Sequence, residues 1–227
     1  MCLKKMTRKI QSIDMNELFI PAEMTELTED IWQQMYNDYH IKRIIADETN
    51  PCFSSQGGVL YNKDMTELLC YPRDKQSKIY HMPNTVSRIA PMAFTDGKYY
   101  PRKLEDIFLS SSLKEIPDNC FRNMKIYGVS IPEGIESIGE YAFANTNLVC
   151  PTLPASLRHL STTAFSDCYI MHMLNVKEDN FGLKKSMLPD NGELQVIIET
   201  FHPIDYSKYP DISVMNLTEM GKWLMEI

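Results

Sequence analysis

The sequence has no long hydrophobic run and no concentration of basic residues. No stretch approaches the roughly 18 apolar residues that a membrane-spanning helix needs. The basic start, MCLKKMTRKIQSIDMNELF, is not followed by the apolar segment of a secretory signal peptide. The formal net charge is −7 and Lys and Arg are scattered, whereas a nucleic-acid surface needs clustered cations. We therefore expect a chain that neither spans a membrane nor binds nucleic acid.

Closely spaced cysteine pairs are also missing. The 227-residue chain is 44% hydrophobic, so it can bury a sizeable core without disulfides. The cysteines form no C-x-x-C motif, and we interpret them as free or buried thiols. They are Cys2, Cys52, Cys70, Cys120, Cys150 and Cys168.

What the sequence does contain is a repeat, seen most clearly in IPEGIESIGEYAF (Ile131–Phe143). Ile131, Ile135, Ile138 and Phe143 stand at successive offsets of four, three and five, and a small or apolar residue directly precedes the aromatic one. These offsets fit neither a single helix nor a single strand. The same pattern occurs without a gap in four other segments, which are Ile20–Trp32, Met82–Phe94, Leu109–Phe121 and Leu153–Phe165.

A short strand pattern, apolar-x-x-apolar-x-apolar, lies just upstream of these copies. Its last positions fall at residues 20, 46, 82, 109, 131, 153 and 175, so the final three steps are 22 residues each. A period of about 20 to 29 residues is the leucine-rich-repeat signature, in which each unit buries its apolar face by stacking on its neighbours. The sequence therefore predicts a leucine-rich-repeat solenoid of about seven coils. We expect a right-handed superhelix of short β-strands and turns, with one aromatic ring of each coil in a shared interior.

The pattern I-x-I-P-x-x-(V/I)-x-x-I-(G)-x-x-A-F, together with NPCFSSQGGVLYNKDMTELLCYP (Asn50–Pro72), resembles the BspA-like leucine-rich repeats. The resemblance covers roughly residues 15–175. Gly57–Asn62 followed by Leu68–Pro72 is similar to the hairpin insertion of that family, and we place its turn at Lys63–Thr66. The resemblance implies an adhesin-like protein, secreted or at a bacterial cell surface. The lack of a visible signal peptide leaves a cytoplasmic location open.

The repeat fades after Asn175. We assign residues 1–175 to the solenoid, with the hairpin insertion at about 50–76, and residues 176–227 to a C-terminal capping segment. Leu194–Ile198 alternates like a strand, and an amphipathic helix is predicted from Val214, Leu217, Met220, Leu224 and Ile227. An open solenoid needs a terminal unit that covers its last coil. We therefore prefer a cap to a separate functional domain or a mobile end segment.

No motif points to catalysis, so we predict no catalytic residue, metal ligand or cofactor. The nearest approach is Cys168-x-x-x-His172, with His159 one coil earlier, but zinc needs three or four converging ligands. Gly57-Gly58 lacks the surroundings of a phosphate-binding loop, and a hairpin explains it. A row of Asp and Asn follows the aromatic column, and we interpret it as turn chemistry. The row contains Asp96, Asn123, Asn145 and Asp167.

Two columns of side chains are expected on the outer face of the stacked strands. One contains Phe19, Ile45, His81, Phe108, Ser130, Thr152 and Leu174, and the other contains Glu17, Arg43, Ile79, Asp106, Gly128, Cys150 and His172. Several members are larger and more apolar than a solvated face requires, and large exposed apolar patches often mark contacts. The alternative is that the hairpin or the tail covers them. The predicted partner-binding residues are Phe19, Arg43, Ile45, His81, Asp106, Phe108, Ser130, Thr152 and His172.

These observations support three functional hypotheses. The first is a non-catalytic interaction protein that presents a curved sheet surface to a protein or glycan partner. The second is an intracellular structural or regulatory scaffold, favoured by the missing signal and the unpaired cysteines. The least favoured is a metal or thiol enzyme built on His159, Cys168 and His172. The sequence does not define an oligomeric state.

Overall fold

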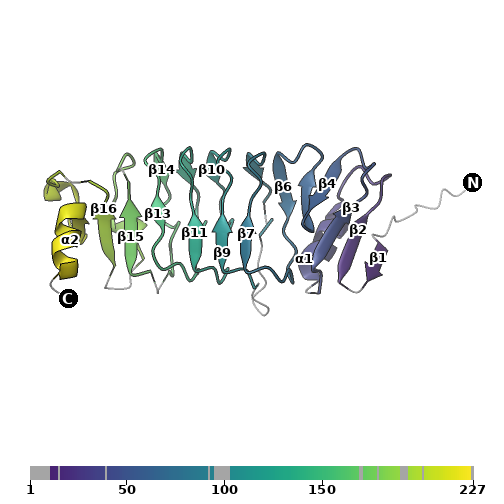
Figure 1. Ribbon diagram of the computed structural model, residues 1–227, viewed down its shortest axis with the longest axis horizontal. Coiled ribbons are helices and arrows are strands. Elements are labelled where there is room, and N and C mark those ends of the chain that lie inside the picture. The colour runs from purple at the N-terminus through teal and green to yellow at the C-terminus, as the bar shows by residue number, and fades with distance from the viewer. Residues whose placement is uncertain are drawn as a thin grey trace, which may run out of the picture.

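The chain winds into an elongated β-solenoid of about eight turns with little helix (Figure 1). This computed structural model describes residues 11–14, 16–38, 40–91, 93–94, 103–168, 171–177, 179–189, 194–200 and 202–225. The described strands stand side by side along the long axis, and β1 and α2 lie at opposite ends of the row (Figure 1). The predicted solenoid is therefore confirmed.

One strand of each coil contributes to what we call the first sheet series, whose outward side is the first face. Near the N-terminus, β2 (Glu17–Ile20) and β3 (Arg43–Ala46) pair in parallel, and β1 (Gln11–Asp14) adds an antiparallel edge on β2. In the middle, the parallel strands are β7 (Ile79–His81), β9 (Asp106–Phe108) and β11 (Gly128–Ser130). Towards the C-terminus, they are β13 (Thr152–Leu153), β15 (Met173–Val176), β16 (Gln195–Ile198) and β17 (Val214–Asn216).

A second strand in the regular coils forms the second sheet series. Its members are only two residues long because the chain turns sharply on both sides of each. They are β8 (Arg88–Ile89), β10 (Glu115–Ile116), β12 (Ser137–Ile138) and β14 (His159–Leu160). Strands β10, β12 and β14 pair in parallel.

The predicted hairpin insertion is a three-stranded element, β4 (Phe53–Gln56), β5 (Val59–Asn62) and β6 (Glu67–Cys70). The turn predicted at Lys63–Thr66 lies between β5 and β6, whereas strand β4 was not predicted. Gly57 and Gly58 join β4 to β5 with φ angles of 59° and 80°, a conformation that glycine adopts without strain. Strand β6 then pairs in parallel with β8, so the insertion continues into the second sheet series.

A stack of phenylalanine rings runs through the interior. Phe94, Phe121, Phe143 and Phe165 are fully buried, with successive ring centroids 5.0, 5.4 and 5.4 Å apart. The predicted interior column of aromatics is confirmed for these four residues. Tyr71, which follows β6, extends the stack with its ring 5.4 Å from that of Phe94.

Backbone hydrogen bonds connect the tight turns of successive coils around this stack. Phe121 N donates to Ala142 O at 2.8 Å, and Phe143 N donates to Ala164 O at 2.9 Å. Small residues in the column before the aromatic allow this close approach of the chains. Ala93, Cys120, Ala142 and Ala164 are all buried, as the repeat predicted.

The Asp and Asn residues after the aromatics occupy left-handed turns. Asn123, Asn145 and Asp167 have φ angles of 65°, 54° and 59°. Asn and Asp tolerate this region better than other residues with a Cβ atom. Their interpretation as turn residues is confirmed, and Asp96 lies outside the described residues.

The first coil departs from the repeat. In place of the second strand and tight turn it forms helix α1 (Glu29–Asn37). Ile31 and Met35 of this helix are buried, whereas Trp32 is only partly buried. The prediction that Trp32 fills the interior like the phenylalanines is therefore wrong, because the helix directs other residues inward.

The predicted register is also wrong at β15, where the inward residues are one position later than expected. Thr152 pairs with Asn175 and Leu153 pairs with Val176, so this step is 23 residues rather than 22. Leu174 and Val176 are fully buried, whereas Met173 and Asn175 are half-buried. The preceding steps of 22 residues predicted that Asn175 would point inward. The extra residue before β15 moves the inward positions to Leu174 and Val176.

The C-terminal segment continues the first sheet series instead of only covering it. Strand β16 matches the predicted strand at Leu194–Ile198 and pairs in parallel with β15, and β17 adds a further parallel strand. Two short 3-10 turns interrupt the connections, η1 (Lys185–Met187) and η2 (Tyr206–Lys208). Helix α2 (Leu217–Met225) follows β17 and packs against β16 and β17. Its Leu224, predicted to lie on the buried stripe, is 57% exposed.

Candidate functional site

The predicted columns of the first face are divided among three sheets, formed by β2 and β3, by β7, β9 and β11, and by β13 with the strands that follow it. Near the N-terminus, Glu17 lies beside Arg43 and Phe19 beside Ile45. In the middle coils, Asp106 pairs with Ile79 on one side and Gly128 on the other, and Phe108 likewise lies between His81 and Ser130. The structure does not pair β3 with β7; the hairpin packs against β3, where Ile44 N donates to Gly58 O at 2.9 Å. The expectation of one continuous column is wrong because the hairpin interrupts it.

Most of the predicted partner-binding residues are accessible. Arg43, His81, Phe108, Ser130 and His172 are exposed. Half-buried members are Phe19, Ile45, Asp106 and Thr152.

Two members of the predicted columns are misplaced by the register shift at β15. Leu174 is buried. His172 does not continue the column of Asp106 and Cys150. Its backbone N donates to Val149 O, so Met173 rather than His172 lies beside Cys150.

An aromatic pair stands at the centre of the first face. The rings of His81 and Phe108 are stacked with centroids 4.4 Å apart and planes 14° apart. Phe108 is 43% exposed, and Ile79 on the same strand as His81 is 52% exposed. Two hollows of similar size flank the pair, since His81 lines one of about 450 Å³ and Phe108 lines another of about 420 Å³. Both volumes are in the range of about 300–1,000 Å³ found for small-ligand sites.

The hollow lined by His81, which we call the hairpin hollow, lies between the Gly57 turn and β7. Lys75 lines it and donates from Nζ to Gly57 O at 2.5 Å. Burial lowers the pKa of Lys75, and the charge of Arg43 lowers it further. Sequence reasoning missed Lys75, although its place directly after the hairpin put it where the chain returns towards the first face.

The hollow lined by Phe108, which we call the coil hollow, crosses β9, β11 and β13. Lys177 lines it and is paired with Glu133, with Nζ and Oε1 2.9 Å apart. This contact raises the pKa of Lys177 and lowers the pKa of Glu133. A Cβ atom on Gly128 would lie 2.2 Å from Asp106 Oδ1, so the glycine makes room for that carboxylate.

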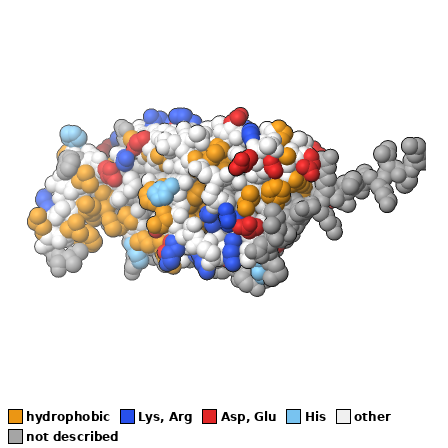
Figure 2. Space-filling model, turned by 45° about the vertical axis from the view of Figure 1, so that its right-hand side comes forward, with side chains coloured by type: hydrophobic (Ala, Val, Ile, Leu, Met, Phe, Trp, Pro, Cys, Tyr) orange, Lys and Arg blue, Asp and Glu red, His pale blue; other side chains and the backbone are white. Residues whose placement is uncertain are grey.

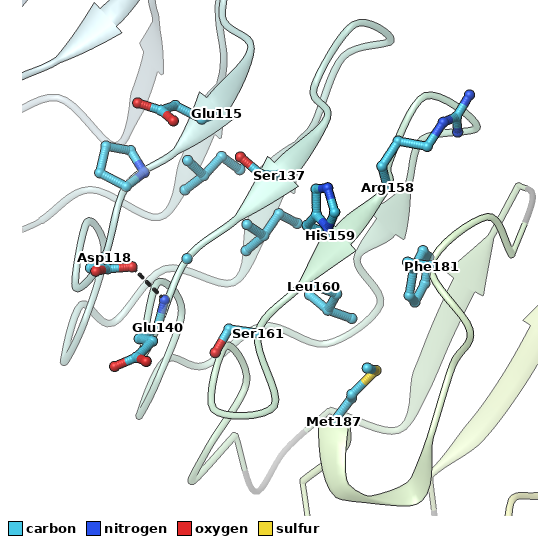
Figure 3. Close-up of a pocket in the computed structure, with 14 residues that line it drawn as sticks. Glu115, Asp118, Ser137, Glu140, Arg158, His159, Leu160, Ser161, Phe181 and Met187 are labelled. Atoms are coloured by element: carbon cyan, nitrogen blue, oxygen red, sulfur yellow. Dashed lines mark hydrogen bonds between the residues drawn. The ribbon is translucent and has the colours of Figure 1, made fainter.

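A larger hollow of about 790 Å³ lies along the second sheet series (Figure 3). Ser137 and His159 line it, and Phe181 and Met187, from the segment after β15, lie on its far side. Sequence reasoning did not anticipate this hollow, because the segment that bounds it lies beyond the clear repeats.

The charged groups around this larger hollow are spread out rather than convergent. Asp118 Oδ1 accepts a hydrogen bond of 2.6 Å from Glu140 N, so this carboxylate is engaged with the backbone of the next coil. Arg158 lies on the other side and donates to Ala155 O and Leu157 O. The arrangement therefore offers no paired acid and base around one reacting atom.

The least favoured hypothesis, an enzyme built on His159, Cys168 and His172, finds no support in the geometry. His159 is exposed on β14 of the second sheet series, and His172 is exposed before β15 of the first. Cys168 is fully buried and donates from Sγ to Phe143 O at 3.1 Å, and burial raises its pKa. Within the part of the chain that the structure describes, no group of three His, Cys, Asp or Glu residues is placed to hold a metal ion.

The outer surface carries both charges and hydrophobic groups. In the view of Figure 2, basic and acidic side chains both occur, and hydrophobic side chains gather at the C-terminal end. Trp223 and Met225 of α2 are 47% and 90% exposed. Of the helices in the described ranges, none is long and apolar enough to cross a membrane.

Known structures with the same fold are bacterial leucine-rich-repeat proteins. The pneumococcal vaccine antigen PcpA superimposes with a TM-score of 0.66 at 19% identity, covering 88% of this chain and 56% of that one. A leucine-rich repeat protein from Eubacterium ventriosum gives 0.67 at 22% identity, covering 81% and 48%. A leucine-rich cell surface protein from Faecalibacterium prausnitzii gives 0.55 at 21% identity, covering 72% and 48%. The chain thus spans about half the length of these structures, and the likeness concerns the fold.

The repeats themselves match a family profile. No curated relative matches the sequence. The BspA type leucine rich repeat region matches in six copies, over residues 73–175 and 96–198, which together span more than half of the chain. The matched residues include the coils with the stacked phenylalanines and both hollows of the first face in part. The chain belongs to the BspA-type leucine-rich-repeat family.

Proposed function

We propose that this protein is a non-catalytic interaction module that binds a protein or glycan partner on the first face, across β7, β9, β11 and β13. The observation that carries the proposal is the exposed pair of His81 and Phe108 between two hollows of ligand size. Aromatic rings held upright on a rigid sheet offer contact area at little entropic cost. The predicted partner-binding residues of the middle coils, namely His81, Asp106, Phe108, Ser130 and Thr152, line or border these hollows.

The proposal is tested by replacing Phe108 with Ser. Because Phe108 is 43% exposed, we expect a nearly unchanged melting curve and loss of binding in a glycan array and in pull-down with purified candidate partners. Tyr127→Ser is a matched control, since Tyr127 is 49% exposed and lines neither hollow of the first face. Equal binding by the wild type and Phe108→Ser would refute the proposal.

The N-terminal group of the predicted residues is tested separately. Phe19 and Ile45 lie side by side and are half-buried, beyond the hairpin from the aromatic pair. If the partner extends over this group, Phe19→Ser weakens binding without a large loss of stability. A large drop in melting temperature would instead assign Phe19 to the core.

We further propose an adhesin-like role at a bacterial cell surface. Support comes from the family and from two structural neighbours, one described as a vaccine antigen and one as a cell surface protein. Antibody labelling of intact cells of the source organism tests the location, and labelling only after lysis would contradict it.

An intracellular scaffold is the second candidate. Within the part of the chain that the structure describes, Cys52, Cys120, Cys150 and Cys168 form no disulfide. Free thiols are typical of reducing compartments. Labelling restricted to lysed cells, together with binding that depends on Phe108, would favour this candidate.

A further inference from the structure

We propose that the hairpin hollow binds a carboxylate-bearing sugar, with Lys75 holding the carboxylate and His81 contacting the sugar ring. This inference rests on the proposed function, because it names the ligand class for one part of the first face.

Lys75 is the charged group at the wall of the hairpin hollow. Lys75 is half-buried at the wall of the hollow, and its ammonium group donates to one backbone carbonyl, Gly57 O. Within the described part of the chain no carboxylate lies within ion-pair distance of it. Neighbouring cations are compensated, since Arg43 pairs with Glu17 at 2.8 Å and Lys78 pairs with Glu105 at 2.8 Å. Lys75 is thus a partly desolvated cation with no carboxylate at ion-pair distance among the described residues, in a chain of net charge −7.

Such a cation is unfavourable without a ligand. Removing an ammonium group from water disfavours its charged form, and a nearby like charge adds to the effect. Both influences act on Lys75, from burial and from Arg43. A bound anion would offset both and would form charge-assisted hydrogen bonds with Nζ. The site therefore fits a negatively charged group better than a neutral one.

The other groups that line the hairpin hollow are both apolar and polar. Ile79 and His81 supply an apolar and an aromatic surface, and Gln56 and Ser77 supply an amide and a hydroxyl group. A sugar ring has an apolar C–H side and hydroxyl groups at its edge, so it can use both kinds of group. A volume of about 450 Å³ is sufficient for a ring with its carboxylate, and it is open to the first face for further sugar units.

The coil hollow, on the other side of the aromatic pair, differs from the hairpin hollow in its charge balance. The two hollows are similar in volume, and each is lined by one lysine. The lysine of the coil hollow, Lys177, is already neutralised by Glu133. A preference for an acidic sugar should therefore depend on Lys75 and not on Lys177.

Calorimetric titration tests the inference with two matched ligand pairs, cellobiouronic acid with cellobiose and sialyllactose with lactose. The wild type is expected to bind at least one acidic member about tenfold more tightly than its neutral counterpart, the effect of one charge-assisted hydrogen bond. Lys75→Met is expected to abolish this preference, and Lys75→Arg to retain part of it. Lys177→Met changes the net charge by the same amount and is expected to leave the preference within about twofold, the usual scale of remote surface changes.

Three results would overturn the inference. They are equal binding of acidic and neutral sugars, no measurable binding of either acidic sugar, or an unchanged preference in a Lys75→Met protein that melts like the wild type. The proposed function would survive each of these if Phe108→Ser still abolished partner binding. If Phe108→Ser also had no effect, both proposals would fail.

Discussion

Two kinds of coil reverse the direction of the chain in different ways. One kind is the regular coils between Leu104 and Leu160, and the other is the first coil, which is built from β2 and α1. A regular coil has a two-residue strand, a turn with a left-handed Asn and a fully buried phenylalanine. The first coil has a helix of nine residues, which buries Ile31 and Met35 and leaves Trp32 partly exposed. The difference shows that an aromatic residue in the repeat position fills the interior only if the local backbone turns tightly enough to direct it there.

The largest expected effect comes from removing a stacked ring. Phe143→Ala is expected to lower the free energy of unfolding by about 3 to 5 kcal/mol, because it leaves a cavity between Phe121 and Phe165. Trp32→Ala, at the equivalent position of the first coil, is expected to cost only about 1 to 2 kcal/mol since the side chain is partly exposed. Urea unfolding measures both. Equal losses would show that the two coils bury their aromatics alike.

The shifted register at β15 gives the next largest effect. Leu174→Ala is expected to cost about 2 to 5 kcal/mol, because Leu174 is fully buried. Met173→Ala, one position earlier on the outward side, is expected to cost about 1 kcal/mol or less. If thermal unfolding showed a larger loss of stability for Met173→Ala than for Leu174→Ala, the inward positions of β15 would be those expected from a uniform 22-residue repeat.

The left-handed turns of the regular coils predict a smaller effect. Asn145→Ala is expected to cost about 1 to 2 kcal/mol, because Ala is strained at a φ of 54°. Asn145→Gly removes the same hydrogen bond to Asn123 but accepts the backbone conformation, and it is expected to cost less. Chemical denaturation of the two variants separates backbone strain from the side-chain contact. A glycine variant that is less stable than the alanine variant would contradict the assignment.

The smallest expected effect concerns the ion pair of Glu133 and Lys177. Both side chains are about half exposed, so Glu133→Gln is expected to cost only about 0 to 1 kcal/mol at pH 7. The hydrogen bond from Lys177 lowers the pKa of Glu133 in the folded state. Its contribution is therefore present above the unfolded pKa of about 4.3 and is lost as the pH falls through the folded value. A stability difference that persists at pH 2 would have another cause.

Much of the fold could be predicted because each coil repeats the same inward pattern. Columns such as Val86, Leu113, Ile135 and Leu157 are apolar in the sequence and fully buried in the structure. Two departures from the repeat, helix α1 and the shifted register of β15, cannot be predicted from the aligned apolar positions alone. Helix α1 begins where the pattern of Ile20–Trp32 still matches, and the extra residue before β15 shifts the phase without changing the composition.

The candidate site could be predicted only in part, for a related reason. Strand periodicity placed His81 beside Phe108 because it defines which residues share a face. It could not indicate that the hairpin divides that face, since this depends on how β4 and β5 pack on β3. It also could not identify Lys75, which lies outside the strands and reaches the hairpin hollow from a connecting segment.

Strand β6 has two neighbours that run in different directions relative to it. It is antiparallel to β5, from which a short turn separates it, and parallel to β8, which lies about twenty residues further along the chain. The hairpin needs only local loop closure, whereas each parallel pairing needs the closure of a whole coil. Once formed, the hairpin offers an edge of β6 to which β8 of the next coil can pair. The insertion that breaks the repeat is thus also suited to start its assembly.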